Sequence, residues 1–547
     1  MRRTVSVCLT AAMIAAAVAV LAPAAGAKVL LVGTYHGVKG QFKTIEAAAK
    51  VAKRGDWILV APGDYKTTKS VAAPGTGGEF PAGVLITAPK VTLRGMNRNT
   101  VIVDGTQKGP ACTDKPADQN FGPSAKGGPA GLNGVEVWKA DSVDVENLTA
   151  CNFLGGSGGD GGTGNEVWWN GGAESGKIGG WGYLGEYLNA TSFFYNPNTK
   201  LSQVKREVSA AEYGIFSSNW DGGTWLNTYA SNMNDSGYYI GACQQECNQV
   251  VNDAWAEYNA LGYSGSNSGG SLVVKDSQFD NNEDGFDTNS QNGDNPPPQN
   301  GSCPNNGVSP ITHTHSCWVF MDNDVHDNND PNVPAAGSAA AGPVGTGMSI
   351  SGGRFDTVMD NTFANNGAWG NIIVPYPDSG PPCTGGQLNN PLLGTGSCLY
   401  DEWGDAVIDN KYSHDGFFGN PTNGDFEQLN FNAGNANDCF SGNTDASGQL
   451  DSGSQLLETE YPSCTGTQAV ANTNGPFLSQ VLCDSGDEIG GVSACVPTDH
   501  YPRVTTINNG LHPLPSKSKL PTMPNPCKGV PKNPWCGGSK KKATRQA

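Results

Sequence analysis

The sequence predicts an all-β fold: a right-handed parallel β-helix, a solenoid of short strands coiled into stacked rungs, with an N-terminal capping helix and inserted loops. A glycine that mostly precedes an aromatic or apolar residue recurs every 23 to 25 residues. Runs of β-type residues end repeatedly in an aspartate followed by a small polar residue, and asparagine pairs come after them. A period of this length indicates one supersecondary unit per repeat, each stacked on its neighbours.

The repeated positions can be read directly from the sequence. The glycines are Gly214, Gly237, Gly262 and Gly285, then Gly347 and Gly370. The aspartates that end the β-type runs are Asp276, Asp322, Asp360 and Asp409. The asparagine pairs include Asn281-Asn282 and Asn365-Asn366. Asparagine tolerates the left-handed backbone of tight turns, and stacked amides hydrogen-bond from rung to rung. Leucine-rich repeats have a similar period, but the leucine ladder that they need is missing.

A capping helix is predicted before the first rung. Thr44 is a suitable helix N-cap, and apolar residues follow at helical spacing over residues 45–52. Gly55-Asp56 ends the helix, residues 57–60 form a short buried strand, and Pro62-Gly63 turns the chain. These residues, with Phe42 and Tyr65, resemble the start of many secreted right-handed β-helix proteins of the pectate-lyase-like superfamily. The resemblance implies a capping helix that leads into the first rung.

The β-helix is expected over residues 28–437, with its coil from about residue 55. Residues 155–200, 291–316 and 376–402 interrupt the repeat and should be loops, where solenoids usually build their binding surface. Residues 438–502 form a Cys-, Gly- and Ser-rich region. Residues 503–547 carry two Arg and seven Lys but no Asp or Glu. Several prolines predict that this basic tail is extended, free to hold anionic surface polymers.

The N-terminus and the cysteines indicate secretion. Arg2 and Arg3 precede a short apolar run and small residues, so residues 1–27 have the pattern of a signal peptide. Its removal takes Cys8 and leaves 14 of the 15 cysteines, an even number that favours disulfides. We expect neighbours in sequence to pair: Cys112–Cys151, Cys243–Cys247, Cys303–Cys317, Cys383–Cys398, Cys439–Cys464, Cys483–Cys495 and Cys527–Cys536.

The composition agrees with a folded β protein outside the cell. Charged residues are 15% of the chain, and its 12 Trp and 18 Phe favour a packed core over disorder. The net charge of −18 argues against nucleic-acid binding. No stretch after the signal is long and apolar enough for a transmembrane segment. We therefore expect a secreted monomer, in solution or associated with the cell surface.

The sharpest candidate site is an acidic turn at Glu283, Asp284 and Asp287. Three carboxylates within five residues can converge on one hard cation. The phrase resembles the acidic-Asp-Gly-aromatic-Asp segment of one calcium-dependent family of β-helix pectate lyases. That resemblance implies Ca²⁺ as cofactor, held by these residues and bridged to a uronate. The alternative is a solvated acidic turn.

The sequence departs from that lyase family at the catalytic base. Members of the family use a downstream lysine to remove the C5 proton of the sugar, and no lysine occurs between Lys275 and Lys411. Arg354 lies in that interval, and it is expected to cap a turn instead. The motifs of polygalacturonases and pectin methylesterases are absent. Catalytic residues are therefore not assigned.

Two further groups of residues are candidates for binding. Trp168, Trp169, Trp181 and Tyr183 could stack on sugar rings, because aromatic faces pack against apolar C–H patches; the alternative is that they form the core of a large insertion. His313 and His315 alternate on one possible strand face, with His326 further on. Zinc needs three ligands held by an ordered outer shell, so surface histidines are the expected outcome.

Two functions remain open. The first is an enzyme on an acidic extracellular polysaccharide, by calcium-assisted β-elimination. The second is a non-catalytic surface or matrix protein that presents its loops to glycan or cell-wall polymer. Fold alone decides neither function. The acidic turn favours the first, and the missing lysine favours the second. A role directed at extracellular polysaccharide is common to both.

Overall fold

A computed structural model describes most of the chain. The described residues are 26–78, 80–125, 128–156, 162–172, 177–192, 210–243, 246–292, 297–335, 339, 341–391, 394–431, 433–452, 457–468, 470–485, 495–503 and 520–537. Most of the expected signal peptide and parts of the basic tail lie outside these ranges. Within them, no helix is both long enough and apolar enough to cross a membrane.

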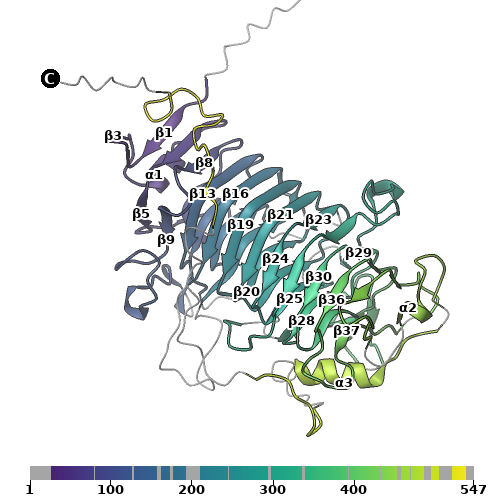
Figure 1. The fold of residues 1–547 in the computed structure, drawn as a ribbon. Coiled ribbons are helices and arrows are strands. Elements are labelled where there is room, and N and C mark those ends of the chain that lie inside the picture. Colours follow the sequence, from purple (N-terminus) through teal and green to yellow (C-terminus); the bar gives the residue numbers. More distant parts are fainter. Residues whose placement is uncertain are drawn as a thin grey trace, which may run out of the picture.

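The molecule is a right-handed parallel β-helix, as predicted (Figure 1). One sheet of 19 strands and one of 11 strands run along its length, and each strand pairs in parallel with the strand of the next rung, apart from β6 at one edge. The 19-stranded sheet bends at a corner into two rows. A rung therefore passes through the first row, the corner, the second row, an asparagine turn and the 11-stranded sheet.

The strands of the larger sheet have the following bounds. The first row contains β1 (Val29–Val32), β4 (Trp57–Val60), β8 (Thr92–Gly95), β23 (Leu272–Lys275), β26 (Trp318–Met321), β29 (Asp356–Met359), β35 (Ala406–Ile408) and β38 (Cys439–Ser441). The second row contains β5 (Gly63–Lys66), β9 (Val101–Asp104), β24 (Gln278–Asp280), β27 (Asp324–His326), β30 (Thr362–Ala364), β36 (Lys411–Ser413) and β39 (Thr444–Asp445). Four long strands cross both rows: β13 (Val143–Cys151), β16 (Tyr183–Thr191), β19 (Gly223–Ser231) and β21 (Gln249–Glu257).

The smaller main sheet and the remaining elements complete the fold. The 11 strands are β6 (Val71–Ala72), β7 (Pro81–Ile86), β12 (Asn133–Trp138), β14 (Asn165–Asn170), β17 (Ala211–Ser218), β20 (Met233–Gly241), β22 (Leu261–Ser266), β25 (Asp284–Asn289), β28 (Thr346–Ser351), β31 (Trp369–Val374) and β37 (Gly424–Gln428). The helices are α1 (Ile45–Ala49), α2 (Leu457–Glu460) and α3 (Gly475–Asp484), with 3-10 turns at Pro116–Asp118 and Pro304–Asn306. Small pairings join β2 (Thr34–Tyr35) to β3 (Val38–Lys39), β10 (Ser124–Ala125) to β11 (Gly128–Pro129), and β15 (Gly180–Trp181) to β18 (Trp220–Asp221).

Two asparagine ladders hold the rungs in register. At the corner, the Asn361 backbone N–H and its Nδ2 both donate to Oδ1 of Asn410 on the next rung, at 3.0 and 2.9 Å. The same pattern connects Asn323, Asn361, Asn410 and Asn443. The second ladder, at the turn into the smaller sheet, connects Asn259, Asn282, Asn328, Asn366 and Asp415. Each buried amide is thereby satisfied inside the wall of the coil.

The residue before each ladder position has a left-handed backbone, as predicted for tight turns. Asp322 and Asp360 have φ values of 55° and 56° at the corner. Asn281 and Asn365 both have a φ of 56° at the turn into the smaller sheet. This conformation changes the direction of the chain within a single residue, so the flanking strands meet at a sharp angle. Asp and Asn adopt it more readily than other residues that carry a Cβ.

The core is a stack of apolar side chains inside the coil. The rings of Tyr263 and Phe286 lie 4.1 Å apart on successive rungs, with an interplanar angle of 1°. The six repeated glycines form a column beside this stack. A Cβ at Gly262 would lie 2.3 Å from the carbonyl oxygen of Gly285, so adjacent rungs approach too closely for a larger residue. The periodic signal in the sequence is therefore a steric requirement.

The N-terminal cap and the rung count differ in detail from the prediction. Helix α1 begins after Thr44, whose side chain accepts from the Ala47 N–H as predicted, but it ends at Ala49. The coil continues through residues 155–200, which were expected to be a loop, because β14 and β16 are rung strands. It also continues past residue 437 to β39.

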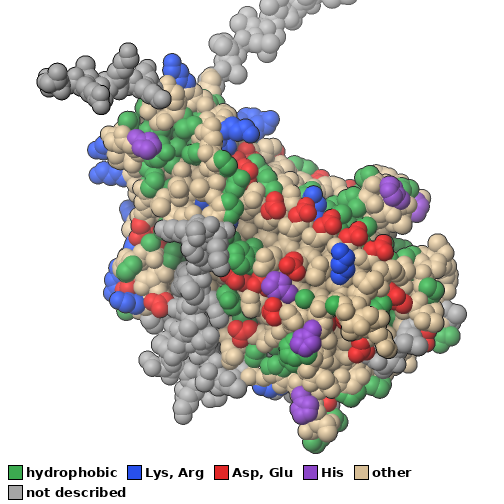
Figure 2. All heavy atoms as spheres, in the orientation of Figure 1, with side chains coloured by type: hydrophobic (Ala, Val, Ile, Leu, Met, Phe, Trp, Pro, Cys, Tyr) green, Lys and Arg blue, Asp and Glu red, His purple; other side chains and the backbone are tan. Residues whose placement is uncertain are grey.

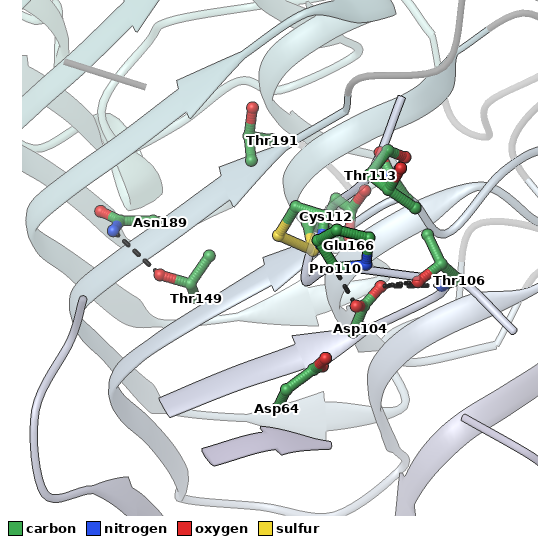
Figure 3. The surroundings of a disulfide bond; sticks show 12 residues. Asp64, Asp104, Thr106, Pro110, Cys112, Thr113, Thr149, Glu166, Asn189 and Thr191 are labelled. Atoms are coloured by element: carbon green, nitrogen blue, oxygen red, sulfur yellow. Dashed lines mark hydrogen bonds between the residues drawn. A yellow bond between two sulfur atoms is a disulfide. The ribbon is translucent and has the colours of Figure 1, made fainter. Parts of the chain in front are cut away.

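The other two expected loops lie outside the coil, and all seven predicted disulfides are present. Cys303–Cys317 closes the connection between β25 and β26. Cys383–Cys398 closes a three-stranded antiparallel sheet of β32 (Tyr376–Ser379), β33 (Gln387–Leu388) and β34 (Ser397–Tyr400). Cys112–Cys151 ties the loop after β9 to the end of β13, where Asp104 accepts from the Cys112 N–H (Figure 3).

The C-terminal region returns to the start of the coil, which corrects the expectation of a free tail. Arg98 donates to the Pro521 carbonyl, and Asn147 accepts from the Met523 N–H. Trp535 packs against Leu31 and Leu59 on the outside of the first rungs. We call residues 520–537 the strap. Figure 1 shows it in yellow beside β1 and β8, at the opposite end from α3.

Candidate functional site

The predicted acidic turn lies where the second asparagine ladder enters β25. Phe286 is buried in the core against Tyr263 and Phe320, and Asp287, its neighbour on the strand, therefore faces outward. The Ser349 hydroxyl contacts Asp287 Oδ1 at 2.6 Å and Asp284 Oδ2 at 3.4 Å, so the two carboxylates share this outer face. Glu283 precedes them and is 6% exposed.

Hydrogen bonds and burial fix the two aspartates. Asp284 accepts from the Phe286 N–H at 3.1 Å, and Asp287 also accepts from Ser351 and Asn289. Burial raises the pKa of Asp284 well above its ordinary value, and the charges of Asp287 and Glu283 raise it further. Burial likewise raises the pKa of Asp287, against the hydrogen bonds that stabilise its charged form. These carboxylates are therefore costly to keep charged without a counter-ion.

Two groups that the sequence did not suggest lie at the same place. Asp484, at the end of α3, has a fully buried side chain whose oxygens accept no hydrogen bond from any described residue. Its pKa is raised by burial, and Glu283 and Asp284 contribute to this shift; Arg503, with Nη1 at 3.6 Å, opposes it. Thr346 is the strand partner of Asp284, and its buried hydroxyl has no hydrogen-bond partner among the described residues. Helix α3 thus adds to the acidic turn a carboxylate that is distant in sequence.

This donor set fits a hard cation in its chemistry, because every donor is oxygen. Its present spacing is wider than a coordination shell. Among the described residues, the one group of three His, Cys, Asp or Glu with ligand atoms all within 4.8 Å of one another is Cys483, Cys495 and Asp499, and its cysteines form a disulfide. A cation at Glu283, Asp284 and Asp287 would therefore have to draw their oxygens together.

The expected aromatic platform is not formed. Trp169 and Tyr183 lie inside the core, 0% and 7% exposed, because β14 and β16 are rungs of the coil. Trp168 stacks on Phe216 at 4.9 Å and is also covered. Trp181 alone of the four presents a ring to solvent, at 52% exposure. Because Gly-rich segments flank β14, the sequence did not identify it as a rung strand. Its core residues were therefore assigned to an inserted loop.

Arg354 caps a turn, as expected. Its Nε donates to the Asp401 carbonyl and its Nη2 to the Gly385 carbonyl, and the guanidinium lies over the Trp403 ring. His315 bonds to the Gly307 carbonyl on the loop closed by Cys303–Cys317, and His313 is exposed there. Among the described residues, neither histidine belongs to a group of three potential metal ligands.

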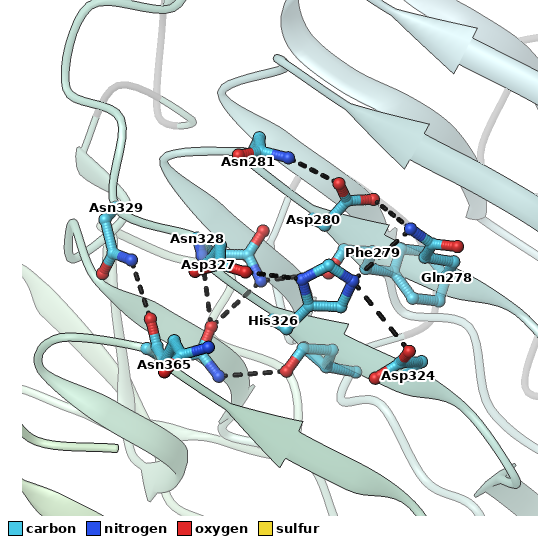
Figure 4. Close-up of polar contacts among 12 residues, drawn as sticks. Gln278, Phe279, Asp280, Asn281, Asp324, His326, Asp327, Asn328, Asn329 and Asn365 are labelled. Carbon is cyan, nitrogen blue, oxygen red and sulfur yellow. Dashed lines mark hydrogen bonds and ion pairs between the residues drawn. The ribbon is translucent and has the colours of Figure 1, made fainter. Parts of the chain in front are cut away.

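A different cluster occupies the outer face of β21, β24 and β27, and sequence reasoning missed it. Glu257, Asp280 and His326 stand at paired positions on successive rungs, so they form one column. His326 Nδ1 lies 2.8 Å from Asp327 Oδ2, and its Nε2 lies 3.9 Å from Asp324 Oδ2 (Figure 4). The side chains of Asp324 and Asp327 are 58% and 47% exposed, so this face is open to solvent. We call it the His326 face.

Aromatic and amide donors hold the carboxylates of the His326 face. Trp255 Nε1 donates to Asp280 Oδ1 at 2.6 Å, and Gln278 Nε2 donates to the same oxygen at 3.0 Å. The Tyr229 hydroxyl donates to Glu257 at 2.7 Å. Burial raises the pKa of Asp280, and the imidazole of His326 lowers it. In the space-filling view, Asp and Glu side chains gather along the middle of the molecule, whereas most Lys and Arg lie near its N-terminal end (Figure 2).

The His326 face combines a polar surface with one imidazole, that of His326. A carboxylate on Nδ1 fixes the orientation of an imidazole, and the other nitrogen can then accept or donate a proton. Trp255 and Tyr258 are half-buried beside it. The column was not visible in the sequence because Asp280 and His326 are separated by twice the usual period, with a loop in between.

Comparisons with known proteins do not assign this chain to a family. No protein-family model matches the sequence, and no curated protein matches it at a significant level. The A-module of a mannuronan C-5 epimerase from Azotobacter vinelandii aligns with a TM-score of 0.43 and 13% identity, over 73% of this chain and 88% of that chain. The β-helix fold of this chain rests on its own strand pairing.

Other solved structures are similar to this β-helix. A mannuronic-acid-specific family 6 polysaccharide lyase from the human gut microbiota aligns with a TM-score of 0.40 and 11% identity, over 76% of this chain and 80% of that chain. A pectate lyase aligns with a TM-score of 0.34 and 13% identity, over 76% of this chain and 74% of that chain. Similarities at this level carry no activity from these proteins to this one.

Proposed function

We propose that this β-helix is a secreted protein that binds an extracellular polysaccharide along the His326 face. The observation that supports the proposal is the column of Glu257, Asp280 and His326, in which the two carboxylates are buried and His326 reaches solvent beside the exposed Asp324 and Asp327. Half-buried aromatic rings flank it. Carboxylates accept hydrogen bonds from sugar hydroxyls, and aromatic rings pack against the apolar side of a sugar. The seven disulfides agree with an oxidising compartment.

Charge restricts the class of glycan. Glu257, Asp280, Asp324 and Asp327 surround a single imidazole, so the face repels a polyuronate in the absence of cations. A neutral polysaccharide binds there directly, whereas an acidic one needs a divalent cation between the carboxylates. If the chain cleaves polyuronates by β-elimination, His326 is the group placed to take the C5 proton, in the role that lysine has in calcium-dependent pectate lyases.

We further propose that Glu283, Asp284 and Asp287 hold Ca²⁺, with Asp484 as an additional ligand. Ca²⁺ would supply the positive charge that this buried acidic group lacks. The support is the raised pKa of Asp284 together with the buried oxygens of Asp484 and Thr346, which accept no hydrogen bond from described residues. This proposal is separate from glycan binding, because the acidic turn lies on a different sheet from the His326 face.

Affinity electrophoresis tests the glycan proposal. The intact protein, His326→Ala and the matched control His414→Ala are run through gels that contain polygalacturonate, alginate or a neutral β-glucan, each with and without Ca²⁺. His414 is an exposed histidine on a later rung, stacked on Phe417. We expect at least one glycan to retard the wild type and the control but not His326→Ala. Equal mobility of all three proteins in every gel would contradict the proposal, and ultraviolet absorbance of an unsaturated product would add lyase activity.

A further inference from the structure

A third ladder lies at the turn where the coil leaves the smaller sheet and returns to the larger one. Asp405 Oδ1 accepts the Asp356 N–H at 2.8 Å, and Asp438 Oδ1 accepts the Asp405 N–H at 2.8 Å. Gln299, which precedes Asp356 in the chain, continues this ladder: its Nε2 donates to Asp356 Oδ2 at 2.8 Å. The backbone bonds therefore repeat the asparagine ladders, but the ladder residues are aspartates.

An aspartate lacks the donor that an asparagine ladder needs. In the neighbouring ladder, Nδ2 of Asn361 donates to Oδ1 of Asn410 at 2.9 Å, beside the backbone bond. Asp356 and Asp405 have a second carboxyl oxygen in place of that amide. These two oxygens, Asp356 Oδ1 and Asp405 Oδ2, are buried and accept no hydrogen bond from any described residue. Both residues are 0% exposed, so water does not take the place of a partner at the surface.

The charged groups around the ladder do not neutralise it. Glu402 is 0% exposed, and its charge, with those of Asp401 and Asp438, acts on the same site. Arg354 is the cation that faces Asp405, yet its Nε and Nη2 donate to backbone carbonyls. The Tyr263 hydroxyl faces Asp356 from the smaller sheet. Among described residues, no three of these carboxylates place their oxygens within 4.8 Å of one another, so a metal shell is not formed either.

We propose that protons complete this ladder: Asp356 and Asp405 are protonated in the native state, and each carboxyl O–H donates to the next aspartate as an asparagine amide does. A neutral carboxyl group has the shape of an amide and offers one donor and one acceptor. Protonation thus satisfies both buried oxygens and removes the repulsion between stacked carboxylates. The C-terminal rungs are therefore most stable at acidic pH, and their stability falls as the protons are lost.

The electrostatics give the sign of the pH dependence. Burial raises the pKa of Asp356 and Asp405 well above the ordinary value, and it raises the pKa of Asp438 to about 7. The folded state therefore holds protons that the unfolded state releases near pH ~4. The stability that these protons supply is complete below that value and is lost as pH rises through the folded pKa.

Two substitutions test the proposal in opposite directions. Thermal unfolding of the intact protein is measured from about pH 4 to about pH 8, with EDTA and with Ca²⁺. We expect the melting temperature of the wild type to fall across this range, and Asp405→Asn to reduce that fall by supplying a permanent amide donor. Other buried carboxyl groups with a raised pKa, such as Glu136 and Asp415, keep the remainder. Asn410→Asp places a carboxyl group in the neighbouring ladder and should add a second fall. Asp324→Asn, on the exposed His326 face, is the matched control and should leave the profile unchanged.

The outcomes of this experiment distinguish protonation of the aspartate ladder from cation binding to it. If Asp405→Asn keeps the full pH dependence, or if Asn410→Asp adds none, protons do not complete the ladder. If Ca²⁺ raises the melting temperature of the wild type and Asp405→Asn abolishes that rise, a cation takes their place and the proposal is wrong. Failure of Asp405→Asn to fold would leave the Asn410→Asp profile to decide. Hydrogen exchange should localise the loosening at high pH to β29, β35 and β38.

Discussion

A methyl group at Gly285 would lie 2.4 Å from the carbonyl oxygen of Gly347 on the next rung. The same contact recurs from Gly347 to Gly370. Both partners are backbone atoms in paired strands, so neither can move without breaking the ladder of the sheet. The glycine repeat was the clearest signal in the sequence because a steric requirement at one residue is repeated on six successive rungs.

Gly285→Ala should lower the free energy of unfolding by about 1–3 kcal/mol, the usual cost of forcing an additional methyl group into a closely packed site. Chemical denaturation measures the change. Gly475→Ala is the control, because a Cβ there has open space and a backbone that alanine adopts. Gly475→Ala should be neutral or slightly stabilising, and equal losses in both variants would contradict the steric explanation.

Single residues also show where sequence reasoning failed. Trp169 and Tyr183 have the pattern of an exposed platform only if residues 155–200 are a loop. The rung strand β14 is bounded by glycines on both sides, and its six residues carry no repeat glycine. Inward and outward positions therefore could not be distinguished. His326 was identified as a surface histidine, but Asp280 and Glu257, the other members of its column, come from other rungs and are not near it in sequence.

The ladders were the most predictable elements. Asn282 and Asn366 were expected to stack, and both do so through backbone and side-chain donors. The prediction succeeded because left-handed turns and buried amides each need a particular residue type at a fixed spacing. The aspartate ladder was not predicted, although its separations of 49 and 33 residues equal those from Asn361 to Asn410 and from Asn410 to Asn443, because single aspartates before a strand form no recognisable phrase. Asp287 faces outward as expected, but Glu283 and Asp284 are 6% and 0% exposed. The contribution of α3 could not be read from residues 200 positions away.

Calcium should stabilise the element formed by β25, β28 and α3, in a pH-dependent way. The folded pKa of Asp284 is raised, so its proton competes with the cation at acidic pH and is displaced at higher pH. We expect Ca²⁺ at about 100 times its Kd to add roughly 2.7 kcal/mol. The gain should be larger near pH 8 than near pH 5. Calorimetric melting of the wild type and Asp284→Asn measures it.

The control for that experiment is Asp324→Asn, which removes an exposed carboxylate from the other sheet. It should keep the calcium effect, whereas Asp284→Asn should lose most of it. No calcium effect at either pH would show that the acidic turn is held by its hydrogen bonds alone. Glycan binding at the His326 face would be untouched by that result.

At the scale of the molecule, the strap folds back onto the N-terminal rungs, at the opposite end of the coil from α3. Arg94 contacts Glu146 and stacks on Trp57, and it donates to the Lys528 carbonyl of the strap. Arg98, which is 1% exposed, is enclosed by Asn189 and the strap. The tail composition indicated solvent, because Lys and Pro dominate it. The signal that was overlooked is Trp535, next to a cysteine that pairs within the tail.

Deletion of residues 520–547 should lower the melting temperature and expose an apolar surface around Leu31 and Leu59. Each fully buried apolar side chain that is lost costs about 1.5–3 kcal/mol, and Leu520, Met523 and Trp535 are all buried in the strap. Differential scanning calorimetry and binding of a hydrophobic dye measure the two effects. Deletion of residues 538–547 alone is the control and should change neither. If both truncations behave like the full chain, the strap does not stabilise the cap.

The strap also has a consequence for how this architecture can change in evolution. Solenoids ordinarily gain and lose repeats easily, because each repeat contacts only its neighbours. Here the chain must travel back from residue 503, beside the last rungs, to residue 520, beside the first. Those 17 peptide steps reach at most about 60 Å when fully extended, and each duplicated rung would move the ends apart by about 4.8 Å. The covalent reach between residues 503 and 520 therefore sets an upper limit on the number of rungs between these two points, a limit that a solenoid without a strap does not have.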